Sequence, residues 1–353
     1  MTNWGSLHSG RFALAVFLTL LPLVTLPLGG CGHGRHRVLE VAYVSAPQAA
    51  LRDQVAAIYN RVGTVKNGER VDVLEREKRF VRVRTAGGLE GWIEQRYLVD
   101  QKTFDGLQTL TRENKADPMQ APGILRNDTN LHLTPGRETE HLYQLPAGSK
   151  VEILKRATAE KDTGQEPTPK PQALSVGGRA AKNAGGPILE DWFLVRDDQG
   201  HVGWVLTRMV DVDVPLDVAQ YAEGQRFVAF FVLDQVPDIQ NGVQKNVPQY
   251  LCLLTEPHDG LPYDYDQLRV FTWNARKHRY ETAYREHGLN GVLPVTVTQE
   301  NFEKEGTLPV FILRVRNDAG AITERKYKLN TPIVRRVLAP GEAPSRPARK
   351  TRR

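Results

Sequence analysis

The 353-residue chain is poor in cysteine, and its two cysteines, Cys31 and Cys252, are too few for a disulfide framework. It also has no G-x-S-x-G, H-E-x-x-H or Walker-type sequence and no C-x-x-C pair. The usual local signals of a serine hydrolase, a zinc peptidase, a P-loop enzyme and a thiol redox enzyme are therefore missing. We predict no catalytic residue, no metal site and no cofactor, and we expect a protein that is not an enzyme.

The remaining reactive side chains do not change this expectation. Cys252 lies in an apolar run, which indicates a buried, inert thiol rather than a nucleophile activated by histidine. His33 and His36 have H-x-x-H spacing, but the stretch around them has no order that would fix metal geometry. Asp264 and Asp266 could hold calcium weakly, but a solvated turn is the simpler interpretation.

The N-terminal segment has the pattern of an export signal. It carries one charge, Arg11, followed by an apolar stretch over residues 12–28. Pro22 and Pro27 interrupt that stretch, which suits a permanent spanning helix poorly. We interpret residues 1–30 as a signal peptide, so the rest of the chain is expected outside the cytoplasm.

The segment ends in Leu28-Gly29-Gly30-Cys31, which resembles the bacterial lipobox. The resemblance implies cleavage before Cys31 and attachment of a lipid, including palmitate, to its thiol. An uncleaved anchor helix with an incidental cysteine is the alternative. The next residue, Gly32, is not aspartate, which implies the outer membrane, facing the periplasm, if the host has two membranes.

The net charge of +6 belongs to one end of the chain. Residues 335–353 contain seven basic residues and one acidic residue, so the rest of the chain sums to about zero. Residues 339–353 are also rich in proline, which indicates a disordered basic tail. The tail could contact anionic lipid or wall polymers, or only improve solubility. No folded basic face is predicted, and nucleic acid is not an expected partner.

An internal repeat is the strongest feature of the sequence. The segment 51–74 aligns with 131–154 at an offset of 80, and both contain a glycine followed by alternating apolar residues. Phe80 and Gly91-Trp92 align with Trp192 and Gly203-Trp204 at an offset of 112. The difference between 112 and 80 means that the second copy carries 32 extra residues. We predict a flexible insert at 156–190, because this stretch has few large apolar residues.

The repeated pattern resembles the bacterial SH3 (SH3b) family, with its Gly-led valine strand, aromatic-x-x-V element and Gly-Trp pair. The resemblance covers residues 41–100 and 124–212, joined by a linker at 101–123, and implies two small SH3-like barrels. Phe80 stands where the family has tryptophan. The opening element also departs from the family at 50–53 and 130–133, where family members often meet ligands, so binding cannot be assumed for both copies.

Five aromatic residues are candidates for core or ligand contacts. Trp92 and Trp204 are expected to plug one end of each core, with ligand contact as the less favoured role. Trp192 and Phe193 are adjacent on a strand, so one ring should face inward and the other outward. The outward ring and Tyr97 are our low-ranked candidates for binding sugar or peptide, which favour flat apolar surfaces with polar rims.

The region 216–338 has short apolar runs that predict an antiparallel β-domain of about five to seven strands. Residues 274–278 and 317–320 are expected to be the turns of two hairpins. A β-sandwich or a small open barrel is the expected architecture, and the family is not recognised.

The sequence thus predicts an all-β protein, anchored to the cell envelope through Cys31. The favoured function is binding of peptidoglycan or an envelope protein by the SH3-like pair. The alternative is a structural or assembly lipoprotein, in which the barrels only scaffold the C-terminal domain. An enzyme in that domain is the least favoured possibility.

Overall fold

The computed structural model describes residues 37–161, 187–240 and 242–338. The predicted signal peptide 1–30, the predicted lipidation site Cys31 and the predicted basic tail 339–353 lie outside these residues. Across the described ranges, no helix is both long enough and apolar enough to cross a membrane.

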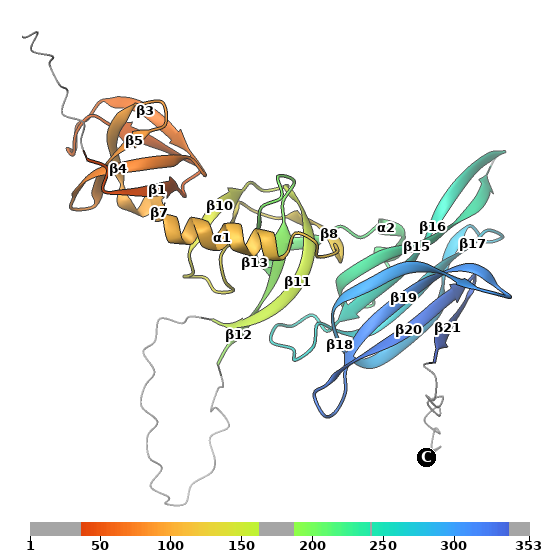
Figure 1. Ribbon diagram of the computed structural model, residues 1–353. Coiled ribbons are helices and arrows are strands. Elements are labelled where there is room, and N and C mark those ends of the chain that lie inside the picture. The colour runs from red at the N-terminus through yellow and green to blue at the C-terminus, as the bar shows by residue number, and fades with distance from the viewer. Residues whose placement is uncertain (1–36, 162–186, 241, 339–353) are drawn as a thin grey trace, which may run out of the picture. The chain divides into compact units, whose positions relative to one another are not determined.

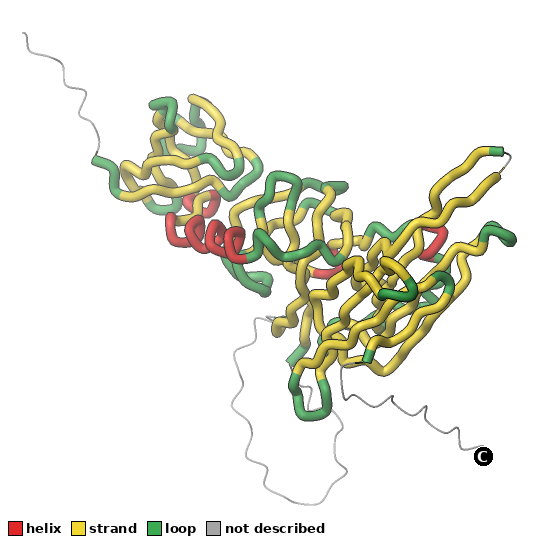
Figure 2. Tube along the Cα trace, turned by 45° about the vertical axis from the view of Figure 1, so that its right-hand side comes forward, coloured by secondary structure: helices red, strands yellow, loops and turns green. Residues whose placement is uncertain are grey.

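The described residues confirm the predicted all-β class, since strands far outnumber helices (Figure 2). Three antiparallel sheets of seven strands each follow one another along the chain (Figure 1). Helical structure in this part of the chain is limited to α1 (Gln101–Glu113), α2 (Leu216–Ala219) and the 3-10 turns η1 (Gln95–Tyr97) and η2 (Thr207–Met209).

The first sheet has the strand order β3-β2-β6-β5-β4-β1-β7 and surrounds an apolar core built mainly of valine and alanine. Its strands are β1 (Glu40–Val44), β2 (Gln48–Arg52), β3 (Arg61–Lys66), β4 (Arg70–Glu77), β5 (Phe80–Thr85), β6 (Glu90–Glu94) and β7 (Leu98–Asp100).

The second sheet has the order β10-β9-β13-β12-β11-β8-β14, which is the order of the first sheet with each number raised by seven. Its strands are β8 (Ala121–Leu125), β9 (Thr129–His132), β10 (His141–Leu145), β11 (Lys150–Glu160), β12 (Leu189–Arg196), β13 (Val202–Leu206) and β14 (Val210–Val212).

The two sheets also share an irregularity. The register of β4 against β5 shifts between Val73 and Glu75, and that of β11 against β12 shifts between Ile153 and Lys155. A β-bulge of this kind inserts one residue and interrupts the alternation of side chains. Leu74 and its counterpart 80 residues later are therefore buried together with the residue before them.

The Gly-Trp pairs are explained by a close strand crossing. A Cβ atom on Gly91 would lie 2.8 Å from Cβ of Leu51, and one on Gly203 would lie 2.6 Å from Cβ of Leu131. Only glycine lets β6 and β13 pass β2 and β9 at this distance.

The expectation that Trp92 and Trp204 plug the cores is wrong. Side chains alternate along a strand, so the following residues, Ile93 and Val205, enter the cores and the tryptophans face away. Trp204 instead packs beside Leu110 of α1 in a separate apolar cluster on the outer face of the second sheet.

The predicted linker 101–123 contains the packed helix α1, which the sequence analysis did not anticipate. Asp100 caps the helix by accepting a hydrogen bond from its first turn. The Phe104 ring stacks on the Tyr43 ring with 3.9 Å between centroids, and Leu107 is fully buried. Apolar residues three apart form this packed stripe.

The predicted flexible insert 156–190 is narrower than expected. Strands β11 and β12 remain paired as far as Glu160 and Leu189, so both ends of the predicted insert are strand. Polar side chains at both ends have partners there: Arg156 bonds to Asp191, and Glu190 bonds to Arg137. The interval 162–186 lies outside the described residues.

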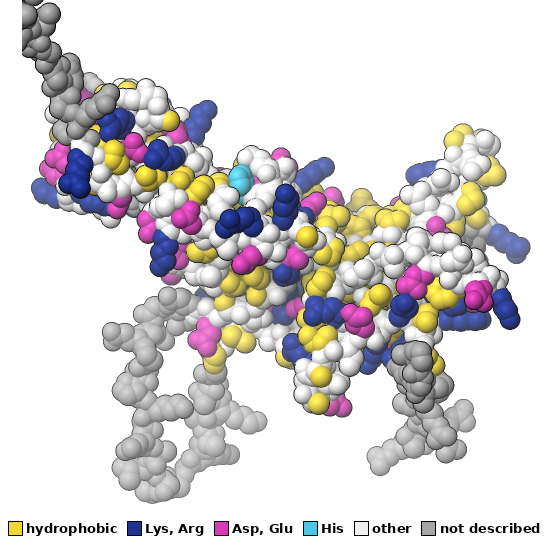
Figure 3. All heavy atoms as spheres, in the orientation of Figure 1, with side chains coloured by type: hydrophobic (Ala, Val, Ile, Leu, Met, Phe, Trp, Pro, Cys, Tyr) yellow, Lys and Arg dark blue, Asp and Glu magenta, His cyan; other side chains and the backbone are white. Residues whose placement is uncertain are grey.

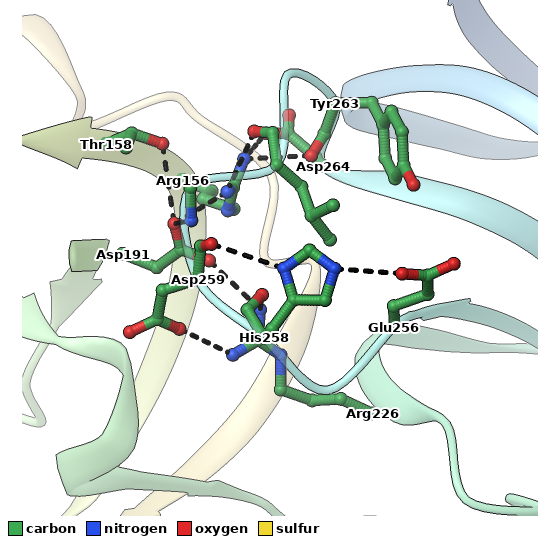
Figure 4. A network of polar contacts seen from close by, with 11 residues as sticks. Arg156, Thr158, Asp191, Arg226, Glu256, His258, Asp259, Tyr263 and Asp264 are labelled. Atoms are coloured by element: carbon green, nitrogen blue, oxygen red, sulfur yellow. Dashed lines mark hydrogen bonds and ion pairs between the residues drawn. The ribbon is translucent and has the colours of Figure 1, made fainter. Parts of the chain in front are cut away.

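A buried polar network connects β11 and β12 to the loop that follows β16 (Figure 4). The Asp191 carboxylate accepts hydrogen bonds from Nη2 of Arg156 at 2.6 Å, from Nη2 of Arg226 at 3.0 Å and from the backbone N–H of Gly260 at 3.0 Å. Arg156 also contacts Asp264 at 3.2 Å, so four charged groups, two arginines and two aspartates, belong to one network.

The third sheet is a meander whose strands lie in sequence order. They are β15 (Arg226–Gln240), β16 (Val243–Thr255), β17 (Tyr265–Asn274), β18 (Arg279–Phe302), β19 (Gly306–Arg316), β20 (Ile322–Asn330) and β21 (Ile333–Val337). The two predicted hairpins are confirmed as β17–β18 and β19–β20.

A single sheet provides the described strands of this region, where a sandwich or a small open barrel was expected. Its first and last strands contribute Val228 and Val334 to the same core, which indicates a curled sheet. This architecture is nearer to the open barrel. The side chains of this core are covered by the curling of one sheet, whereas a second cluster on the sheet, around Tyr250 and Phe271, packs against Val218 of α2.

Candidate functional site

The first sheet carries a cavity of about 620 Å³ at the end where β2, the β4–β5 turn and β5 meet. Arg52 is the last residue of β2, and Phe80 is the first residue of β5. Lys78 and Arg79 form the two-residue turn between β4 and β5, and the loop after β2 adds Val55, Ala56 and Ala57 to the lining. The volume is within the usual range for small-ligand sites.

The second sheet carries a cavity of about 350 Å³ whose lining includes His132 and Trp192. These residues correspond to Arg52 and Phe80 at the offsets of the sequence repeat, 80 and 112. The two cavities therefore occupy equivalent positions on two sheets of the same topology. Each is built from an aromatic ring near the start of one strand, at the first residue of β5 or the fourth of β12, and a polar side chain that ends another strand.

Arg52 is held between two rings in the first cavity. Its guanidinium carbon lies 4.1 Å from the centroid of Tyr59 and 5.0 Å from that of Phe80. The loop that carries Tyr59 is closed by Asp53, whose carboxylate accepts two hydrogen bonds from Asn60, at 2.9 and 2.8 Å. These bonds lower the pKa of Asp53. The ring, the loop and the cation thus form one preorganised wall.

The polar residue of the second cavity is uncharged near neutral pH. Burial, with a smaller effect from His141, lowers the pKa of His132 to about 4. The His132 ring lies 5.4 Å from the Trp192 ring in an edge-to-face arrangement. Its Nδ1 atom is 3.1 Å from the hydroxyl of Thr139, in the loop between β9 and β10.

A bidentate ion pair fastens that loop to β12. Arg137 donates from Nε to Oε2 of Glu190 at 2.8 Å and from Nη2 to Oε1 at 2.5 Å. Hydrogen bonds from Arg137 lower the pKa of Glu190, whose side chain is only 7% exposed. Arg137 also lines the second cavity together with Trp192, which follows Glu190 by two residues on β12.

Trp192 and Phe193 face opposite sides of β12, as expected, but the expectation that the outward ring is exposed is wrong. Both are 2% exposed. Phe193 lies in the core of the second sheet, while Trp192 faces the other side and is covered by the loop that Arg137 fastens. Trp192 still lines the cavity, whereas Phe193 does not.

Tyr97 is half-buried and packs against the core of the first sheet. Arg96 donates a hydrogen bond to its hydroxyl at 2.8 Å and lies over its ring. Tyr97 lines neither of the two cavities. The structure therefore does not bring the three predicted ligand-binding residues together, and their role in binding stays a prediction.

Sequence reasoning missed Arg52, Lys78, Arg79 and His132. The signal was present, because Arg52 and His132 align at the offset of 80 within the element treated as a departure from the family. On the face drawn in Figure 3, basic and acidic side chains are interspersed. The overall composition therefore does not reveal the charge around one cavity.

Two of the residues considered for a chemical role, Cys252 and Asp264, have structural roles instead. Cys252 is 1% exposed in an apolar cluster, and burial raises the pKa of its thiol. Asp264 accepts hydrogen bonds from the backbone N–H of Leu293 and from Arg156. Within the described ranges, no group of three or more His, Cys, Asp or Glu residues is placed to hold a metal ion. His33 and His36 lie outside those ranges.

The topology and cavity of the first sheet define a small SH3-like module. Residues 48–99 match the family described as the bacterial SH3 domain, so the chain contains one bacterial SH3 domain, located in the first sheet. No curated protein matches the chain.

Three solved structures show a weak likeness. One is an NlpC/P60 family protein from Bacillus cereus ATCC 10987, with 11% identity, a TM-score of 0.23, and coverage of 56% of this chain and 65% of that one. The others are NlpC2 and NlpC1 from Trichomonas vaginalis, with identities of 11% and 10% and TM-scores of 0.16 each. They cover 84% and 69% of this chain, and 95% and 87% of their own. This chain spans less than two thirds of the Bacillus protein.

Proposed function

We propose that this protein is a lipid-anchored binding protein of the cell envelope that is not an enzyme. In this proposal the second sheet is a diverged second SH3b copy, and the pair recognises peptidoglycan or an envelope protein. The observation that carries the proposal is the pair of cavities at equivalent positions, each built around an aromatic ring. The burial of Cys252 supports the non-enzymatic part, because a nucleophilic thiol must be accessible.

Sedimentation with purified peptidoglycan sacculi tests wall binding. The soluble chain starting at Gly32 is expected to pellet with sacculi at moderate salt, and to do so after removal of residues 340–353. Ala57→Trp should reduce pelleting, because Ala57 is exposed and lines the first cavity, which a large ring would fill. Ala86→Trp, at an exposed turn of the same sheet, is the matched control.

Either of two results would overturn wall binding. One is the absence of pelleting, and the other is pelleting that disappears with the basic tail. Both would favour a protein partner in the envelope. Equal loss in Ala57→Trp and Ala86→Trp would show that the cavity is not the contact surface.

Membrane fractionation tests the anchor. Cys31→Ser removes the thiol that would accept the lipid, so the protein is expected to move out of the membrane fraction. Leu28→Ala is a milder change in the same segment and should leave more protein attached. If Cys31→Ser stays fully in the membrane fraction, an uncleaved anchor helix replaces the lipid in this proposal.

One observation favours the alternative function, in which the SH3-like pair is only a scaffold. Asp191 and its partners join the second sheet to the loop before the third sheet's β17 through a fully buried carboxylate. In that role the SH3-like pair positions the C-terminal domain and binds no ligand. Failure to pellet sacculi, together with loss of C-terminal stability on disrupting this network, would support it.

A further inference from the structure

The first cavity is lined by cations without an acidic residue. Arg52, Lys78 and Arg79 contribute three positive charges, and the remaining lining is Phe80 with small apolar side chains. This is an unusual lining for a chain whose described part is close to neutral overall, so the charge is concentrated at the cavity.

These cations are only weakly neutralised. Nη2 of Arg52 is 3.4 Å from Oε1 of Glu94, whose other oxygen is held by Arg96 at 2.9 Å. Among the described residues, no ion pair involves Lys78 or Arg79, and both side chains are exposed. The cavity therefore keeps a positive field that an anionic ligand would complete.

The guanidinium groups are positioned by an aromatic ring. The Phe80 ring lies 5.0 Å from the guanidinium carbon of Arg52 and 5.4 Å from that of Arg79. Arg52 is fixed from its other side by Tyr59. A guanidinium held in this way presents its N–H donors in a fixed plane, which matches the two oxygens of a carboxylate.

The turn that supplies two of the cations is conformationally strained. Lys78 has a φ of 54°, in the left-handed region that glycine occupies without penalty. The equivalent hairpin of the second sheet carries the long insertion instead.

The lining of the second cavity has the opposite balance of charge. Asp128 and Glu138 line it, and the charge of Arg137 is engaged by Glu190. His132, in the place of Arg52, is half-buried and neutral near pH 7. The two equivalent cavities therefore differ in the sign of the ligand that they favour.

We propose that the cavity of the first sheet binds the free carboxylate of a short peptide with small side chains. The guanidinium groups of Arg52 and Arg79 would hold the carboxylate, and Val55, Ala56 and Ala57 would contact the small side chains next to it. This names the ligand class of the first cavity and rests on its proposed role in binding.

A pair of matched probes tests this assignment. Alanine tripeptides labelled at the N-terminus, one with a free C-terminal carboxylate and one with a C-terminal amide, are titrated with the chain from Gly32 by fluorescence anisotropy. The acid is expected to bind about tenfold more tightly, because one charge-assisted hydrogen bond contributes roughly that factor. Arg79→Gln should remove most of this preference. Arg70→Gln, at the opposite end of β4, should keep it while lowering net charge equally.

Competition with small anions separates carboxylate from phosphate. Acetate is expected to displace the acid peptide at concentrations no higher than inorganic phosphate. Displacement by phosphate at clearly lower concentrations would assign the cavity to a phosphate-bearing ligand and overturn the proposal. Equal binding of acid and amide, or equal effects of Arg79→Gln and Arg70→Gln, would also overturn it.

The outcome of the peptide-binding test can be distinguished from that of the sedimentation test for wall binding. If sacculi still pellet with Arg79→Gln and the two peptides bind equally, the carboxylate proposal fails while wall binding stands. If the acid preference depends on Arg79 but sacculi do not pellet, the cavity assignment stands and the wall is not its target.

Discussion

Arg52 and His132 show how one position can give two equivalent cavities different chemistry. An arginine stays charged at every physiological pH, whereas the half-buried histidine, with a pKa of about 4, stays neutral above that value. The surrounding scaffold is the same in topology, so the difference comes from the side chains alone. Selectivity in such a pair is set at single residues rather than by the fold.

At the same scale, the Arg137–Glu190 pair should stabilise the second sheet in a pH-dependent way. Arg137→Ala is expected to lower the free energy of unfolding by about 1–2 kcal/mol at pH 7, because it removes the two hydrogen bonds to a nearly buried carboxylate and leaves it only the longer contact with Arg208, at 3.5 Å. Chemical unfolding followed by tryptophan fluorescence measures this difference.

The sign of the pH effect follows from the pKa of Glu190, which is lowered in the folded protein from its usual 4.5. The contribution is complete above 4.5 and is lost as the pH falls through the lower folded value. The difference between wild type and Arg137→Ala should thus shrink between pH 5 and pH 3. Arg76→Ala, which breaks an exposed pair with Glu40, should cost less than about 1 kcal/mol. A constant difference for Arg137→Ala across this range would contradict the assignment.

Among the elements, strands and hairpins of the repeat and of the third sheet could be read from alternating apolar residues and turn sequences. The positions of Leu74 and Leu154 could not, because a bulge interrupts the alternation that makes a strand recognisable. Helix α1 was missed since its apolar stripe is short and lies in a polar segment. Its stability depends on contacts with Tyr43 and Leu142, which come from distant parts of the sequence.

The cavities show the same limit of prediction from sequence. A sequence identifies aromatic residues but does not reveal which of them a loop will cover. Trp192 was a reasonable candidate by position, yet its ring is buried beside a loop that Arg137 joins to Glu190, 53 residues away in sequence. The cationic lining of the first cavity likewise brings together Arg52, at the end of β2, and two residues of the β4–β5 turn.

For the whole molecule, the buried carboxylate of Asp191 is the most consequential polar group described. Asp191→Ala would leave Arg156 and Arg226 without their shared partner, and the side chain of Arg156 is only 5% exposed. We expect a loss of about 3–5 kcal/mol in the free energy of unfolding, the usual cost of breaking a buried charge pair. Thermal and chemical denaturation measure it.

A surface pair provides the comparison. Asp211→Ala removes an ion pair with Arg126 in which both side chains are more than half exposed, so it should cost less than about 1 kcal/mol. If Asp191→Ala were no more destabilising than Asp211→Ala, the network would not hold the second sheet to the loop after β16. The scaffold alternative would then lose its supporting observation.

Each of the three sheets is made from one uninterrupted stretch of the chain, and within the first two the earliest strand pairs with the latest, β1 with β7 and β8 with β14. A growing polypeptide can therefore complete one sheet before the next has been synthesised, as domains generally do. The extra residues between β11 and β12 delay the second closure only slightly, because loop entropy rises slowly with length. The strand order thus allows the three sheets to close in sequence from the N-terminus, with the SH3 module first.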